Sequence, residues 1–163
     1  MAQKDHGQRM AHCVRHRTAG LKLKHVSRER EAMLDKFTVG RDLLVVDDES
    51  SVADTLAVIF TQHGYQARVA YSAEQALELI RDWAPNLAIV DVCLPGMHGI
   101  DFSILLLVSH PQCRVLLVSG RPESADLVAH AASAGHPFEI YAKPTPPDEL
   151  LMRAAELLRP GTA

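Results

Sequence analysis

The chain has 163 residues, 47% of them hydrophobic, and a formal net charge of −3. This length accommodates one ordinary domain with an extension, and this composition argues against a wholly disordered chain. Apolar stretches reach only five residues, as at Ile104–Val108, and the polar N-terminus lacks an apolar core, which argues against a membrane span and a secretory signal.

Residues 1–36 form a basic segment with nine Lys or Arg and four Asp or Glu, net +5, whereas residues 37–163 hold eight and sixteen, net −8. A short helix is predicted over Val26–Phe37, and nothing else in this segment repeats at helical or strand spacing. Because a helix-turn-helix signal and interleaved aromatic residues are lacking, we expect residues 1–40 to be a mostly disordered extension that does not bind nucleic acid. The alternative is a basic arm that contacts nucleic acid or an acidic partner.

From Arg41 onwards, short apolar runs alternate with amphipathic segments. The predicted strands are Leu43–Val46, Gln66–Ala70, Leu87–Val90, Val115–Val118 and Glu139–Ala142. The predicted helices are Ser51–His63, Ala73–Asp82, Gly99–Ser109, Glu123–Ala134 and Pro147–Leu158. Parallel strands need crossover connections, so we predict one α/β domain over residues 41–160, with a doubly wound five-stranded parallel sheet. Residues 161–163 remain as a C-terminal tail.

Polar side chains follow four of the predicted strands. Asp47 and Asp48 follow the first strand, Asp91 the third, Ser119 the fourth and Lys143 the fifth. Because the carboxyl ends of parallel strands meet at one edge, we expect these side chains to converge. Three carboxylates brought together need a cation, and Mg²⁺ suits a few carboxylates with retained waters. Alone, each residue has an ordinary explanation as a cap, turn or surface residue, but the set suits phosphoryl transfer.

Four motifs in this order resemble the receiver domains of two-component response regulators. They are Val-Asp-Asp-Glu at Val46–Glu49, Val-Asp-Val-Cys-Leu-Pro-Gly-Met-His-Gly at Val90–Gly99, Val-Ser-Gly at Val118–Gly120 and Ala-Lys-Pro at Ala142–Pro144. The resemblance covers Asp42–Arg159 and implies a flavodoxin-like fold. It also implies a stand-alone signalling switch that accepts a phosphoryl group from a sensor histidine kinase or a histidine phosphotransfer protein. Such a switch acts on an unknown downstream protein and catalyses only its own phosphorylation and dephosphorylation.

The same resemblance assigns a magnesium site around the phosphoacceptor. It implies that Asp91 is the phosphoacceptor and nucleophile and also a metal ligand. Asp48 would bind Mg²⁺ directly, and Asp47 would act mainly through a bound water. The backbone carbonyl of Cys93 would supply a further ligand. The three cysteines of the chain have neither CxxC nor CxH spacing, so we expect reduced thiols in a cytoplasmic protein.

The resemblance further implies a set of switch residues. Lys143 would pair with the acceptor and then with a phosphoryl oxygen, Ser119 would turn towards the phosphoryl group, and Pro144 would follow a cis peptide. The family often carries an aromatic residue three positions before the lysine, where this chain has Ile140. Tyr141 comes one position later, and alternation places it on the other side of the strand. Phosphorylation is therefore better supported than the usual aromatic switch.

The predicted helix over Gly99–Ser109 is more apolar than a surface helix needs. Helical spacing places Ile104, Leu105 and Val108 on the same face as Asp101, which should face solvent. We predict that these three apolar residues form a contact surface for a partner or for a second copy in a homodimer. The alternative is a helix that is buried on all sides.

Three other functions compete with the phosphorylation switch. The first is a protein-interaction module of the same fold that never turns over phosphate, although its usual sequence marks are absent. The second is a DNA-binding regulator that uses the basic N-terminal segment, and it predicts salt-dependent binding. The third is a small-molecule phosphatase, which normally has a second carboxylate close after the nucleophile, where this chain has Cys93.

Overall fold

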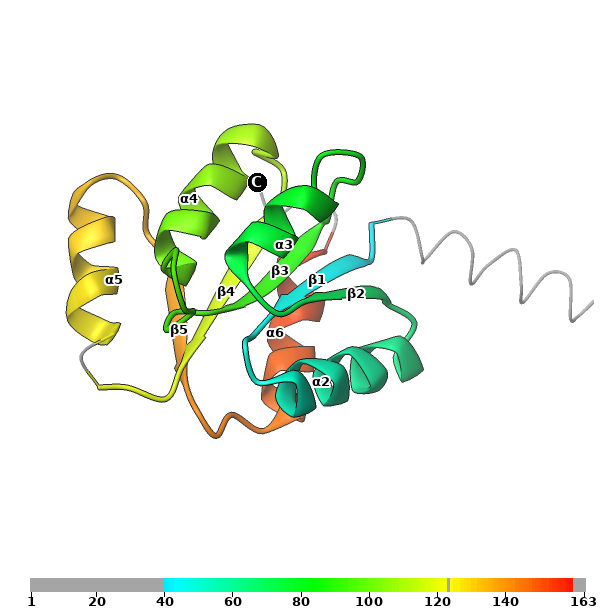
Figure 1. The fold of residues 1–163 in the computed structure, drawn as a ribbon. Coiled ribbons are helices and arrows are strands. Elements are labelled where there is room, and N and C mark those ends of the chain that lie inside the picture. The colour runs from blue at the N-terminus through cyan, green and yellow to red at the C-terminus, as the bar shows by residue number, and fades with distance from the viewer. Residues whose placement is uncertain (1–39, 123, 160–163) are drawn as a thin grey trace, which may run out of the picture. The chain divides into compact units, whose positions relative to one another are not determined.

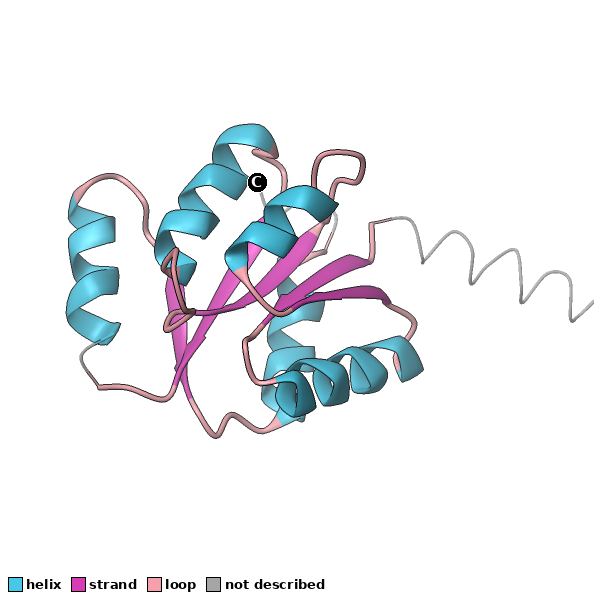
Figure 2. Cartoon of the chain, in the orientation of Figure 1, coloured by secondary structure: helices cyan, strands magenta, loops and turns pink. Residues whose placement is uncertain are grey.

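The computed structural model describes residues 40–122 and 124–159. The helix expected over Val26–Phe37, the rest of the basic extension and the tail over 161–163 lie outside the described residues. Strands and helices alternate along the described chain (Figure 2). The strands are β1 (Asp42–Val46), β2 (Gln66–Ala70), β3 (Leu87–Asp91), β4 (Arg114–Ser119) and β5 (Glu139–Ala142). The helices are α2 (Ser50–Gln62), α3 (Ala73–Leu79), α4 (Gly99–Ser109), α5 (Ser124–Ser133) and α6 (Pro147–Leu157).

The five strands form one parallel sheet in the order β2-β1-β3-β4-β5. Helices α2 and α6 pack on one face, and α3, α4 and α5 pack on the other (Figure 1). The strand order reverses between β1 and β3, which is where ligands gather in doubly wound folds. The predicted fold class is therefore confirmed, and β1 and β3 carry the acidic residues to this switch point.

Each central strand is buried on both faces of the sheet. In β1, Leu44 and Val46 pack with α3 and α4, whereas Leu43 and Val45 pack with α2 and α6. All five residues of β3 are buried. This explains why these strands are continuous apolar runs in the sequence. The two cores fix the strands on which the candidate site residues sit.

Helix α3 ends three residues earlier than its pattern predicts. Ser72 caps its start, where the Ser72 hydroxyl accepts a hydrogen bond from the backbone N–H of Gln75. Ile80 is its buried C-cap, and the chain then turns so that Trp83 lies under the Arg68 guanidinium, 4.5 Å from the ring centroid. This tertiary packing overrides the helical pattern of the last predicted turn.

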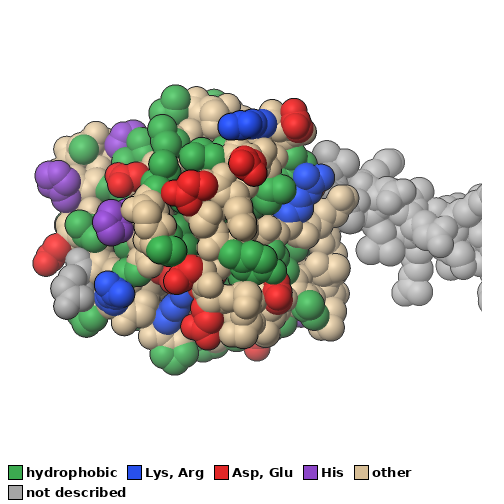
Figure 3. Space-filling model, viewed as in Figure 1, with side chains coloured by type: hydrophobic (Ala, Val, Ile, Leu, Met, Phe, Trp, Pro, Cys, Tyr) green, Lys and Arg blue, Asp and Glu red, His purple; other side chains and the backbone are tan. Residues whose placement is uncertain are grey.

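Helix α4 has the predicted bounds, but the predicted apolar surface on it is smaller than expected. Leu105 and Val108 are 45% and 74% exposed, whereas Phe102 and Leu106 are fully buried. Ile104 is half-buried and packs against the core, so it adds less to this surface than Leu105 and Val108 do. Figure 3 shows hydrophobic side chains on the surface over α4. Across the described residues, no helix is both long enough and apolar enough to cross a membrane.

Candidate functional site

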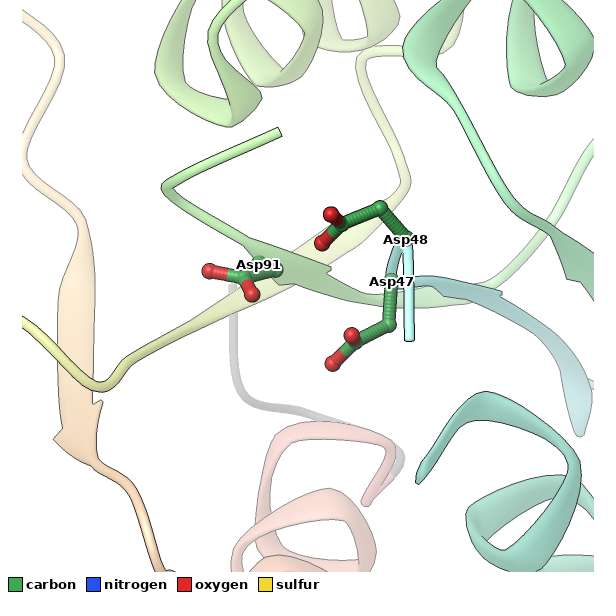
Figure 4. A group of neighbouring side chains, drawn as sticks. All are labelled: Asp47, Asp48 and Asp91. Atoms are coloured by element: carbon green, nitrogen blue, oxygen red, sulfur yellow. The ribbon is translucent and has the colours of Figure 1, made fainter. Parts of the chain in front are cut away.

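Three carboxylates meet at the carboxyl ends of β1 and β3. Asp47 and Asp48 directly follow β1, and Asp91 is the last residue of β3. One oxygen from each lies within 4.8 Å of the others, and the side chains face a common space (Figure 4). Asp47 and Asp91 are buried, whereas Asp48 is exposed. A donor set of carboxylate oxygens fits a hard divalent cation such as Mg²⁺.

Lys143 bridges two of these carboxylates. Its Nζ donates to Asp47 Oδ2 and to Asp91 Oδ2, each at 2.6 Å. Lys143 is positioned by its own backbone N–H, which donates to the carbonyl of Ser119 at 2.8 Å and ties the end of β5 to β4. The sequence resemblance implied a contact with Asp91 but not the one with Asp47. The contact with Asp47 arises because β1 and β3 are neighbours in the sheet.

The second oxygen of each buried carboxylate is held by the loop that follows it. Asp47 Oδ1 accepts from the backbone N–H of Glu49 at 3.1 Å, and Asp91 Oδ1 accepts from that of Cys93 at 2.9 Å. These bonds fold each loop back over the strand end. The orientation of Asp47 and of Asp91 is therefore fixed by a backbone N–H on one oxygen and by the shared ammonium group of Lys143 on the other.

The local charges depend on one another. Burial raises the pKa of Asp47 and the neighbouring Asp91 adds to this, while hydrogen bonds from Lys143 and the Glu49 backbone oppose it. Burial alone would lower the pKa of Lys143, but its hydrogen bonds to Asp47 and Asp91 outweigh burial, so this pKa is raised. The lysine therefore stays cationic at neutral pH. One ammonium group faces three carboxylate side chains, and a divalent cation would balance the negative charge that remains.

Ser119 lies at the end of β4 with its hydroxyl in a buried polar group. Its Oγ is 2.5 Å from the Oγ of Ser124 and accepts from the backbone N–H of Arg121 at 3.1 Å. Ser124 is the first residue of α5, and the Sγ of Cys93 lies 3.6 Å from the Ser124 Oγ and 3.7 Å from the Ser119 Oγ. Sequence reasoning did not single out Ser124. Its only signal is a hydroxyl residue five positions after Ser119, where a helix begins.

Glycine is required where α4 begins beside the candidate acceptor. A Cβ on Gly99 would lie 1.9 Å from the backbone carbonyl oxygen of Asp91. The Gly99 backbone N–H donates to the carbonyl of Val92 at 3.1 Å. The first turn of α4 therefore packs directly against the backbone of the acceptor and helps to fix it.

A pocket of about 830 Å³ opens beside the acidic group. Asp48, Cys93, His98 and Arg121 are among its lining residues. It gives solvent, and a ligand larger than water, access to the site. The pocket therefore presents both a carboxylate, Asp48, and a guanidinium, Arg121.

The end of β5 follows the sequence expectation. Ile140 packs against the core beneath α3, α4 and α5, whereas Tyr141 packs on the opposite face with α2 and α6. Strand alternation predicted this division. The Lys143–Pro144 peptide bond is cis, as the resemblance implied.

Comparison with known protein families identifies the family of this chain. The family model of the response regulator receiver domain matches residues 43–155. The chain belongs to this family. It is 30% identical over 122 residues to the DNA-binding response regulator MtrA of Mycolicibacterium smegmatis, covering 75% of this chain and 52% of MtrA. It is 32% identical over 115 residues to the transcriptional regulatory protein CreB of Escherichia coli, covering 71% of this chain and 49% of CreB.

The fold also matches solved receiver structures. A CheY-like receiver domain protein from Methanospirillum hungatei superposes with a TM-score of 0.66 at 26% identity, covering 72% of this chain and 93% of that one. The chain spans about half the length of MtrA and CreB, and the shared part is the receiver domain. The chain therefore carries a response regulator receiver domain, a class of domain that works in phosphorylation-dependent signalling.

Proposed function

We propose that this protein is a signalling switch that accepts a phosphoryl group on Asp91 from a phosphohistidine and then acts through protein contacts. The contact that supports this most directly joins Lys143 Nζ to Asp91 Oδ2 at 2.6 Å, inside a group of three carboxylates. The donor would be a sensor histidine kinase or a histidine phosphotransfer protein. The only reactions that we assign to the chain itself are its own phosphorylation and dephosphorylation.

The proposed transfer is a displacement at phosphorus. A carboxylate oxygen of Asp91 forms the new P–O bond while the P–N bond of phosphohistidine breaks, and its electron pair stays on the imidazole nitrogen. The product on this chain is an acyl phosphate. Lys143, which starts on Asp91 Oδ2, is placed to pair with a phosphoryl oxygen once that carboxylate is phosphorylated. Ser119 would then turn its hydroxyl towards another phosphoryl oxygen.

Magnesium is the cofactor that this site would take. We propose Asp48, Asp91 and the backbone carbonyl of Cys93 as direct ligands, with Asp47 acting through a bound water. The bound ion would offset the charge of the carboxylates and of the incoming phosphoryl group. The hydrogen bonds do not distinguish Asp47 from Asp91, since both oxygens of each already accept one, so the water-mediated role of Asp47 rests on the family resemblance.

A small phosphodonor tests the proposal without knowledge of the kinase. Phosphoramidate has a P–N bond like that of phosphohistidine, and intact mass reports the addition of one phosphoryl group. We expect labelling of the wild type in Mg²⁺, with none in excess chelator and none for Asp91→Asn. Asp101→Asn removes an exposed carboxylate of α4 and should label normally. Labelling of Asp91→Asn, or labelling that is unchanged in chelator, would overturn the assignment.

DNA binding is the second candidate function, because the similar proteins MtrA and CreB are described as DNA-binding and transcriptional regulators. In this chain the basic residues 1–36, net +5, are the segment whose charge favours such a contact. The expectation that nucleic acid is not a partner stays a prediction. DNA affinity of the full chain that falls steeply with salt, and is lost on removal of residues 1–36, would favour this alternative.

A further inference from the structure

The hydroxyl groups of Ser119 and Ser124 form a buried pair between the end of β4 and the start of α5. Their Oγ atoms are 2.5 Å apart, and the residues are 4% and 1% exposed. The thiol of Cys93, two residues after Asp91, lies 3.7 Å from the first hydroxyl and 3.6 Å from the second. The three side chains connect the acceptor loop, the end of β4 and the first residue of α5.

We propose that Ser124 is a positioning residue that holds the Ser119 hydroxyl in the unphosphorylated state and couples phosphorylation to α5. This inference rests on the proposed function, in which Ser119 turns towards a phosphoryl group on Asp91. Ser124 itself touches neither the acceptor carboxylate nor the phosphoryl group. Its effect on the phosphoryl group runs through its contact with Ser119.

Geometry makes the two states of Ser119 exclusive. The 2.5 Å contact with Ser124 and the backbone contacts with Arg121 fix the direction of the Ser119 side chain, and a hydroxyl that turns towards Asp91 leaves its place beside Ser124. Turning Ser119 towards the phosphoryl group breaks this bond and leaves the buried hydroxyl of Ser124 with the weakly bonding thiol of Cys93. A thiol is a weaker hydrogen-bond partner than a hydroxyl, so this state favours a shift of the start of α5 that gives Ser124 a better partner. Phosphorylation would thereby change the position of α5.

Residue 140 is an isoleucine, which makes the connection from Ser119 through Ser124 to α5 more important in this chain. Ile140, at the position of the family's usual aromatic residue, packs into the core and has no polar group with which to follow the movement of Ser119. The Ser119–Ser124 pair joins the switch hydroxyl directly to a helix. It therefore supplies the mechanical connection that an aromatic side chain would otherwise provide.

Beryllofluoride, an analogue of the phosphoryl group, tests the inference in the full chain with Mg²⁺. Ser124→Ala should bind it more tightly by roughly 2- to 12-fold, the effect of one hydrogen bond removed from the resting state. In a Ser119→Ala background, the added Ser124→Ala change should have no effect on affinity. Ser103→Ala is a matched control, because Ser103 is fully buried and bonds only to the Gly99 carbonyl of its own helix in the described structure, so affinity should not change.

The readouts separate positioning from a structural role. If Ser124 only stabilises the start of α5, its replacement will change affinity equally in both backgrounds, or not at all, and the inference is overturned. Backbone amide signals of α5 should also shift on binding in the wild type and shift less in Ser124→Ala. If the wild type binds no beryllofluoride in Mg²⁺, the proposed function fails and the inference fails with it.

Discussion

Lys143 and Asp91 are 52 positions apart in the sequence, yet Lys143 Nζ lies 2.6 Å from Asp91 Oδ2. The same nitrogen contacts Asp47 Oδ2 at 2.6 Å, so one ammonium group holds the ends of β1, β3 and β5 together. This arrangement neutralises part of the acidic group before a ligand binds. A phosphoryl group on Asp91 would compete with both carboxylates for the lysine.

Replacing Lys143 should lower the stability of the fold, because the carboxylates of Asp47 and Asp91 lose the ammonium group that balances them. We expect Lys143→Ala to lower the free energy of unfolding without Mg²⁺ by about 1–3 kcal/mol, less than the loss from breaking a fully buried pair, because the side chain is 24% exposed. Magnesium should still bind and recover part of the loss. Arg153→Ala, which removes exposed ion pairs with Glu139 and Glu156, should cost less than about 1 kcal/mol. Equal effects of the two changes in urea unfolding would contradict this.

Asp48→Asn should separate metal binding from folding. Asp48 is exposed, and removing its charge relieves repulsion with Asp47 and Asp91, so stability without metal should be unchanged or higher. In the wild type, Mg²⁺ at 100 times its dissociation constant should add about 2.7 kcal/mol. That gain should be largely lost in Asp48→Asn and kept in Asp101→Asn. Thermal unfolding with and without Mg²⁺ measures both, and full magnesium stabilisation of Asp48→Asn would exclude Asp48 as a ligand.

The start of α4 should tolerate no side chain at residue 99. Gly99→Ala would place a Cβ at 1.9 Å from the Asp91 carbonyl oxygen, so we expect a loss of about 1–3 kcal/mol from the backbone shift. Gly120→Ala is the control, because its Cβ would lie 3.9 Å from the Cβ of Lys143, and it should change stability by less than about 1 kcal/mol. Urea unfolding distinguishes the two, and a Gly99→Ala variant as stable as wild type would refute the close packing.

Two adjacent leucines test the exposed face of α4. Leu105 is 45% exposed, so Leu105→Asp should cost about 1 kcal/mol, whereas Leu106→Asp should unfold the domain by burying an unpaired charge. Circular dichroism and urea unfolding report the difference. If Leu105 and Val108 also form a contact surface, sedimentation should show weaker association of Leu105→Asp. An unfolded Leu105→Asp variant would show that the helix is buried on this side.

The sequence predicted the elements well because local rules govern them. Continuous apolar runs identified the two-sided strands, and Gly64 and Gly135, both with positive φ, follow α2 and α5 as helix-ending glycines do. The grouping of the candidate site residues could also be predicted, because side chains that follow parallel strands lie at the same edge of the sheet. This placed Asp91 and Lys143 together without knowledge of any distance.

The remaining features depend on packing between distant segments. The Asp47–Lys143 contact requires the neighbouring positions of β1 and β3, and the Ser119–Ser124 pair requires the path of the loop before α5. Helical periodicity also could not show that Ile104 turns towards the core, because neighbouring elements decide how far α4 is rotated. Such contacts leave no local pattern in the sequence.

Locating the modified residue tests the central claim most directly. After incubation with phosphoramidate and Mg²⁺, borohydride reduces an acyl phosphate of aspartate to homoserine, which marks the site permanently for peptide mass spectrometry. We predict homoserine at position 91 and unmodified aspartate at positions 47, 48 and 101. Homoserine at another aspartate, or phosphate recovered on a serine or histidine with residue 91 unchanged, would contradict the assignment of Asp91 as the phosphoacceptor.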